Sequence, residues 1–179
     1  YFVASEMSEW NDGWSYDTFL GDLAAVNGAM TGSQLAQSIV DAYAAGEGGS
    51  SGDTQSSIDL TQVPALTTAI DDFAVELMYN RSTYGTEIDN ARDNTYELDY
   101  ATPYYHQVDL YDFCLNLEAQ SVPQTLKDKS AAVRTAINNA VLNNFSASGS
   151  IDTYGVGIYY PRTPSDYDSY YDSTLIAPS

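Results

Sequence analysis

Positive charge is the scarcest property of this sequence. Its 179 residues include six Lys and Arg against 25 Asp and Glu, so the formal net charge is −19 at pH 7. A surface of this sign repels phosphate groups, which argues against nucleic acids and anionic membranes as partners. Solubility is the commonest reason for such an acidic surface, and cationic partners are the second.

Cysteine and histidine are nearly absent, with Cys114 and His106 the only residue of each type. One cysteine forms no internal disulfide and provides no cysteine-based zinc site. A Cys–His dyad would be the obvious catalytic arrangement. We reject it, because Cys114 falls on the apolar helix face of Leu110, Phe113 and Leu117. A thiol on such a face is normally inert, and its pKa is raised.

Long hydrophobic runs are also missing. No apolar stretch approaches the roughly 20 residues that cross a bilayer, so no membrane span is predicted. The chain is instead rich in tyrosine, with 16 residues, and in Ser, Thr, Asn and Asp. This polar composition is common outside the cell, and we expect a secreted or extracytoplasmic protein.

What is present at the start of the chain is a strand, a loop and a helix. Residues 1–5 form a short apolar run, and apolar side chains recur at helical spacing over residues 16–26. This helix face is expected to pack on the sheet. The loop between the two carries three acids and two tryptophans: Glu6, Glu9, Trp10, Asp12 and Trp14. Ligands bind where the strands of α/β units end, so this loop is the first candidate site.

The rest of the chain continues to alternate between strands and helices. Helices are predicted over residues 31–46, 64–77, 82–98, 109–123 and 124–144, and strands over residues 57–63 and 154–161. Residues 163–179 are rich in Asp, Ser and Tyr and are expected to be irregular. The length favours a single domain over residues 1–179. About three strands with five to six helices make an α/β fold.

Three local signals mark helix starts or close contacts. Thr31 and Gln34 have the spacing of a capping box, and Asp109 is placed to cap a helix. Gly155 and Gly157 alternate with apolar residues in the last predicted strand. Glycine in a strand often marks the close approach of another backbone.

The acidic loop could bind a positively charged side chain. A carboxylate there would pair with Arg or Lys, and an aromatic wall would exclude water. We favour Asp12, because Gly13 beside it lets the backbone approach a ligand, and we place Glu6 second. The predicted substrate-binding residues are Asp12, Trp14, Glu6, Trp10 and Tyr16. The alternative is that the carboxylates are solvated and the tryptophans simply cover the sheet, and both interpretations stay open.

A calcium site near the C-terminus is the one cofactor that we considered. Asp166, Asp168 and Asp172 carry the hard oxygen ligands that calcium prefers. They lack the Asp-x-Asp-x-Asp-Gly loop, so a solvated acidic tail is the better interpretation. We therefore expect no cofactor.

Three segments resemble the clostripain-like cysteine peptidases. Tyr1-Phe2-Val3-Ala4-Ser5-Glu6, followed by Gly13-Trp14-Ser15-Tyr16, resembles a strand and loop of that family. Val108-Asp109-Leu110-Tyr111-Asp112-Phe113 resembles one of its helix starts, and Gly157-Ile158-Tyr159-Tyr160-Pro161 resembles a later strand. The three segments occur in the family's order and with roughly its spacing.

The resemblance implies a caspase-like α/β/α sandwich and an endopeptidase that cuts peptides or proteins after Arg or Lys. In that family the catalytic His and an Asp-x-Cys segment lie N-terminal to the strand that matches residues 1–6. We therefore expect the C-terminal part of such a peptidase, which supplies scaffold and specificity pocket but no catalytic residue. Its partner would be the missing N-terminal catalytic segment, and alone it should be inactive.

The rival hypothesis comes from a different functional class. It is a non-catalytic extracytoplasmic domain that binds peptide or glycan through the loop of Trp10 and Trp14. A parent protein without a catalytic His and Cys would favour it.

Overall fold

The computed structural model describes residues 1–7, 13–46, 53–98, 106–147 and 153–168. Within these ranges the chain forms six strands, five α-helices and one 3-10 helix. In chain order they are β1 (Phe2–Ala4), α1 (Tyr16–Ala25), α2 (Gly32–Gly46), β2 (Thr54–Ile58), η1 (Leu60–Gln62), α3 (Val63–Asn94), β3 (Glu97–Leu98), β4 (Gln107–Asp109), α4 (Leu110–Glu118), α5 (Gln124–Ala140), β5 (Val141–Ser146) and β6 (Gly157–Tyr159).

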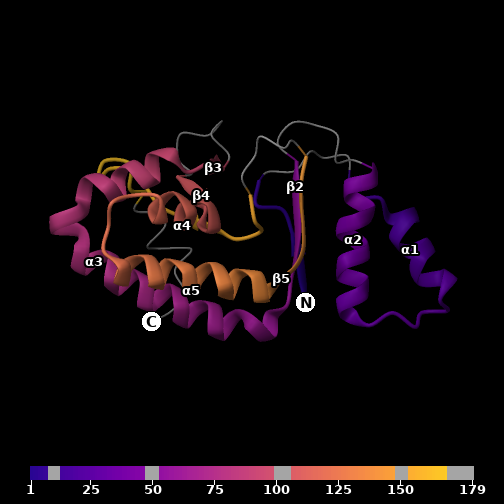
Figure 1. The fold of residues 1–179 in the computed structure, drawn as a ribbon. Coiled ribbons are helices and arrows are strands. Elements are labelled where there is room, and N and C mark those ends of the chain that lie inside the picture. The colour runs from indigo at the N-terminus through magenta and orange to yellow at the C-terminus, as the bar shows by residue number, and fades with distance from the viewer. Residues whose placement is uncertain (8–12, 47–52, 99–105, 148–152, 169–179) are drawn as a thin grey trace.

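Two three-stranded antiparallel sheets organise these elements. The first has the order β1-β2-β5 and the second the order β3-β4-β6. Figure 1 shows the first sheet between two helical layers, with α1 and α2 on one side and α3, α4 and α5 on the other. The α/β class and the layered sandwich are confirmed. The described residues contain six short strands where about three were expected.

The main apolar core lies among α3, α4 and α5. Phe73, Phe113, Leu126 and Ile137 are each at most 2% exposed, and the ring centroids of Phe73 and Phe113 lie 6.1 Å apart. Burying side chains of this size stabilises the fold by about 1.5–3 kcal/mol each. Tyr160, just after β6, packs its ring edge-on against Phe113 with centroids 5.1 Å apart. The core therefore also anchors the second sheet.

Helix α1 differs from its expected position. Phe19 is buried, but Tyr16 and Leu20 are 57% and 51% exposed. Figure 1 shows α1 on the outer side of α2, away from the sheet. We expected the apolar face of α1 to pack on the sheet, and this was wrong. Helix α2 covers that side of the sheet, and α1 packs on α2.

Two element boundaries also differ from the prediction. The helix predicted over residues 124–144 ends at Ala140, and the chain continues directly as β5. The strand predicted over residues 57–63 ends at Ile58, because the Asp59 carboxylate accepts a hydrogen bond from Thr61 N (2.9 Å) and starts η1. Leu60, expected inside, is 50% exposed.

Several local predictions are confirmed. Thr31 N donates to Gln34 Oε1 (2.8 Å) and Gln34 N to Thr31 Oγ1 (3.2 Å), which is the reciprocal pattern of a capping box. The two helices predicted over residues 64–77 and 82–98 are instead the single helix α3, which is interrupted at Tyr84, where φ is −116° and ψ is 27°. Its end at Asn94 leaves Glu97–Leu98, predicted as helix, to form β3. In the part of the chain that the structure describes, no helix is both long and apolar enough to cross a bilayer.

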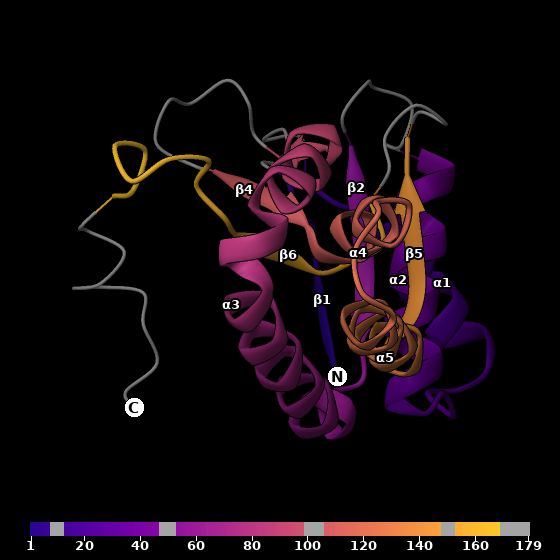
Figure 2. The ribbon, with the colours of Figure 1, turned by 60° about the vertical axis from the view of Figure 1, so that its left-hand side comes forward.

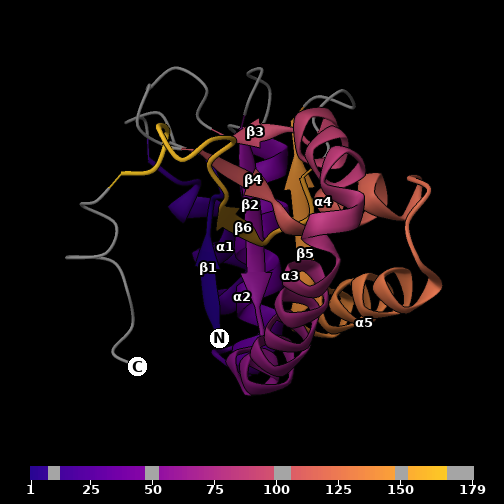
Figure 3. The same ribbon diagram turned by 90° about the vertical axis from the view of Figure 1, so that its left-hand side faces the viewer.

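The second sheet lies close to the end of β1. Figures 2 and 3 show β1 running from the N-terminus toward the level of β4 and β6. The segment just before β6 connects the two sheets: Leu110 N donates to Val156 O (2.9 Å), and Ser56 Oγ on β2 donates to Gly155 O (3.4 Å). Residues that follow β1 therefore face residues of the second sheet.

Candidate functional site

Glu6 occupies this junction between the two sheets. Ser5 Oγ lies 2.7 Å from Thr54 Oγ1, and Glu6 N donates to the same Thr54 oxygen at 3.2 Å. These contacts fix the backbone just after β1 and turn the Glu6 side chain inward. Its Oε2 then accepts a hydrogen bond of 2.7 Å from Gly155 N.

Asp109 binds the backbone N–H group next to that of Gly155. Its Oδ2 accepts from Tyr154 N (2.6 Å), while its Oδ1 accepts from Asp112 N (2.7 Å) and caps α4. Asp109 is completely buried. Two acids, Glu6 shortly after β1 and Asp109 at the end of β4, thus bind consecutive backbone N–H groups, those of Tyr154 and Gly155.

The two carboxyl groups share one environment, and their pKa values are both raised. Burial raises the pKa of Glu6 to about 9, and the negative charge of Asp109 adds to the rise. Burial raises the pKa of Asp109 to about 6, opposed by the N–H groups of Asp112 and Tyr154. Near pH 7 the pair therefore keeps one proton, which Glu6 holds because its pKa is the higher of the two.

A small hollow of about 220 Å³ opens beside Glu6. Polar groups of Ser5, Ser56 and Gln107 line it together with Gly155 and Gly157. Gly155 has φ +94°, and a Cβ there would lie 3.0 Å from the Ser56 Cβ. The Glu6 Oε1 atom is buried and accepts no N–H or O–H hydrogen bond from the described protein groups. The hollow combines a half-buried acid, polar groups, the apolar residues Phe2 and Ile58, and room for a compact side-chain head group.

The predicted site residues fall into three groups. Glu6 lines the hollow. Trp14 and Tyr16 stack on each other, with ring centroids 6.5 Å apart, and Tyr16 continues to Phe19 at 5.5 Å. Asp12 and Trp10, together with Glu9, lie outside the described residues. Asp109 is recognisable from the sequence as a helix cap, but no sequence pattern predicts that it lies beside Glu6.

Cys114 and His106 do not form a nucleophile and base. Cys114 is fully buried on α4, and burial raises the pKa of its thiol to about 12. His106 Nδ1 lies 3.1 Å from Glu97 Oε1, in the second sheet. A thiol that stays protonated and inaccessible cannot attack a peptide bond, so the rejection of this dyad is consistent with the structure.

Asp166, one of the three aspartates considered for calcium, already accepts other hydrogen bonds. Asp166 Oδ2 accepts from Thr163 N (3.0 Å) and from Thr163 Oγ1 (2.8 Å), as in a capped turn. Asp172 lies outside the described residues. Within the described part of the chain, no cluster of three or more His, Cys, Asp or Glu side chains is placed to hold a metal ion.

Comparison with known families decides the classification. A family model described as the clostripain family matches residues 1–175 of the chain. This protein belongs to the clostripain family. A search of curated proteins found no match. The resemblance noted in the three sequence segments is thereby confirmed.

The structure shows why those three clostripain-family segments occur together. The first ends at Glu6, the second contains Asp109, and the third pairs with the second, with Val108 opposite Ile158 in the sheet. Gly155, two residues before the third segment, binds Glu6 directly. Segments that are far apart in the sequence therefore meet at the Glu6–Asp109 carboxyl pair.

Proposed function

We propose that this chain is the C-terminal, substrate-recognising portion of a clostripain-family cysteine endopeptidase with a preference for Arg or Lys at the cleavage position. Family membership supports a cysteine-peptidase function and a peptide substrate. The catalytic His and Cys come from a segment outside these 179 residues, because Cys114 is buried and His106 is paired with Glu97. We propose a secreted or extracytoplasmic location for the same enzyme.

The observation that carries the charge preference is the half-buried carboxyl of Glu6 beside the hollow, with its Oε1 atom buried. A guanidinium or ammonium group entering that hollow would replace the proton on Glu6 as the partner of its carboxyl group. The ionised Glu6 and Asp109 would then carry two negative charges, and the incoming cation would offset one of them. A neutral side chain carries no charge that could take the place of the Glu6 proton.

The proposal that this chain recognises the substrate while another segment supplies the catalytic residues is tested by hydrolysis of a fluorogenic peptide that contains Arg. The chain alone is expected to show no turnover, because its thiol is buried and protonated. The complete enzyme, with the catalytic segment present, is expected to cut after Arg and Lys in preference to neutral residues. Turnover by the chain alone that disappears in Cys114→Ala would contradict the proposal.

A second function is favoured by one observation, the aromatic pair of Trp14 and Tyr16. Their rings stack, and Tyr16 is 57% exposed, as in platforms that bind peptides or sugar rings. A non-catalytic binding domain of this kind would retain ligand binding in a parent protein that never hydrolyses peptides. A parent that lacks the catalytic His and Asp-x-Cys segment would support this second function and overturn the first.

A further inference from the structure

Gln107 of β4 lines the hollow beside Glu6. Side chains alternate between the two faces of a strand, so Gln107 points to the same side of β4 as Asp109, two residues further on. That side faces Glu6, because Asp109 and Glu6 bind adjacent backbone N–H groups there. The Gln107 amide is therefore directed into the same space as the Glu6 carboxyl group.

The register of the second sheet agrees with this orientation. Asp109 lies opposite Gly157, and Gln107 lies opposite Tyr159. A Cβ added at Gly157 would lie 3.9 Å from Glu6 Oε1, so this face of the sheet borders the hollow. Because Gly157 has no side chain, it leaves room for a ligand beside Glu6 Oε1.

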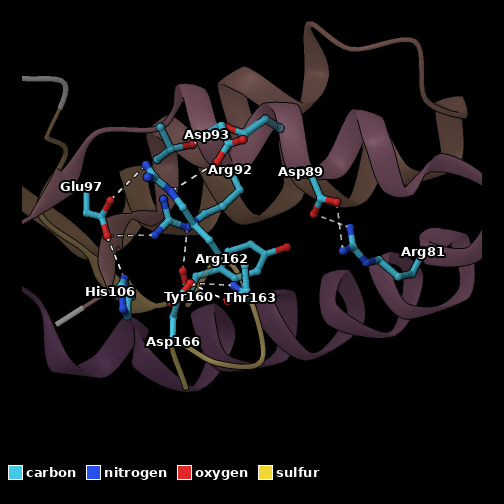
Figure 4. A network of polar contacts seen from close by, with 12 residues as sticks. Arg81, Asp89, Arg92, Asp93, Glu97, His106, Tyr160, Arg162, Thr163 and Asp166 are labelled. Atoms are coloured by element: carbon cyan, nitrogen blue, oxygen red, sulfur yellow. Dashed lines mark hydrogen bonds and ion pairs between the residues drawn. The ribbon is translucent and has the colours of Figure 1, made fainter. Parts of the chain in front are cut away.

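An ion-pair network holds the other face of the second sheet. Glu97 of β3 lies 3.1 Å from His106 Nδ1, and it also pairs with Arg92 (3.4 Å) and Arg162 (3.1 Å), as Figure 4 shows. In the sheet Glu97 lies opposite the residue after Gln107, so its side chain is on the other face. The network stabilises the strand that presents Gln107 and does not use the Gln107 amide.

Two polar atoms at the hollow are available to a ligand. Within the part of the chain that the structure describes, Glu6 Oε1 is buried and receives no N–H or O–H hydrogen bond, and the Gln107 amide makes no side-chain hydrogen bond. Polar groups in partly buried sites normally have hydrogen-bond partners, so a ligand that donates to both oxygens is favoured.

A guanidinium and an ammonium group differ in how they can use these two oxygens. A guanidinium carries five N–H donors in a planar fork, so one edge can donate to Glu6 while another N–H donates to the Gln107 amide oxygen. An ammonium group is a compact, strongly hydrated charge with three donors on one nitrogen. The planar head group therefore makes better use of a second acceptor.

We propose that Gln107 is the second hydrogen-bond partner of the substrate head group and favours Arg over Lys at the cleavage position. The role of Gln107 rests on the proposed function, in which Glu6 binds the charge of the same head group. Arg and Lys carry equal charge, so Glu6 alone discriminates little between them. The neutral amide of Gln107 responds to the shape of the cation and to the number of its donors.

The test is an NMR titration of the whole 179-residue chain with argininamide and with lysinamide, followed through the Glu6 carboxyl carbon and the Gly155 amide. We expect argininamide to bind about fivefold more tightly. Gln107→Met keeps the length of the side chain and removes the amide. It is expected to weaken argininamide binding about fivefold and lysinamide binding less than about twofold. Retained binding of lysinamide also reports that the hollow of the variant is intact.

Gln120→Met is the matched control. Gln120 is also half-buried, but it donates to Asn116 O (3.3 Å) just after α4 and does not line the hollow. We expect this variant to bind both amides like the unmodified chain. Equal affinity of the unmodified chain for the two amides, or equal effects on both in Gln107→Met, would overturn the role of Gln107 and leave the proposed function standing. Unchanged binding in Glu6→Gln, or no binding of either amide, would overturn both.

Discussion

Replacing Glu6 by Gln is expected to lower kcat/KM of the complete enzyme for a substrate with Arg at the cleavage position. The expected decrease corresponds to a loss of about 2–4 kcal/mol in transition-state stabilisation. Glu6 supplies the carboxyl group that faces the hollow, and glutamine cannot lose a proton to meet a cation. A neutral residue at the same position makes no use of that charge, so its kcat/KM should change little. The measurement is a comparison of two fluorogenic substrates that differ only in this residue.

Asp12→Asn belongs in the same experiment, because sequence reasoning favours Asp12 as the direct partner of the cation. If Asp12 is the residue that pairs with the cation, then Asp12→Asn, and not Glu6→Gln, should lower kcat/KM for the Arg substrate alone. That decrease should correspond to about 2–4 kcal/mol. Asp71→Asn, at an exposed acid of α3, removes the same charge elsewhere and controls for long-range effects. Equal losses for basic and neutral substrates in both site variants would mean that these acids support the fold and do not select the substrate.

Asp109→Ala is expected to lower the free energy of unfolding by about 2–4 kcal/mol. Loss of the cap of α4 accounts for about 1 kcal/mol, and the unpaired N–H of Tyr154 for about 1–3 kcal/mol more. Urea unfolding followed by circular dichroism measures the difference.

Asp59→Ala provides the control for this stability experiment. Asp59 also caps a helical turn, accepting from Thr61 N at 2.9 Å, but it holds no second element. Its replacement should cost about 0.5–1 kcal/mol. Asp109→Asn keeps an acceptor for one of the two N–H groups and should fall between the two alanine variants. A loss in Asp109→Ala no larger than that in Asp59→Ala would show that Asp109 does not connect the sheets.

Local chemistry predicted the parts of the site that depend on neighbours in the sequence. The cap at Asp109, the capping box at Thr31 and the position of Glu6 after the first strand all follow from short-range patterns. The glycines pointed to close packing, but the expected neighbour was wrong for Gly155, which lies against the side chains of Ser56 and Val141 and not against another backbone segment. These features need only a few consecutive residues to specify them.

The pairing of Glu6 with Asp109 could not be read from the sequence. It depends on both sheets meeting at residues 154 and 155, and no spacing rule brings these segments together. Strand β5 was missed because the apolar residues Val141 and Leu142 extend the helical pattern of α5 without a Gly or Pro to end it. The antiparallel partner β2 decides that boundary.

The central claim is that Glu6 holds a proton that a cationic side chain can replace. An NMR titration of the Glu6 and Asp109 carboxyl carbons in this chain, with and without argininamide, tests it most directly. The account predicts that Glu6 titrates near pH 9, far above the usual 4.5, and Asp109 near 6. A cation favours the ionised carboxyl, so argininamide should lower the pKa of Glu6, whereas the uncharged citrulline amide should not. Titration of Glu6 near pH 4.5, or a pKa that argininamide leaves unchanged, would contradict the account.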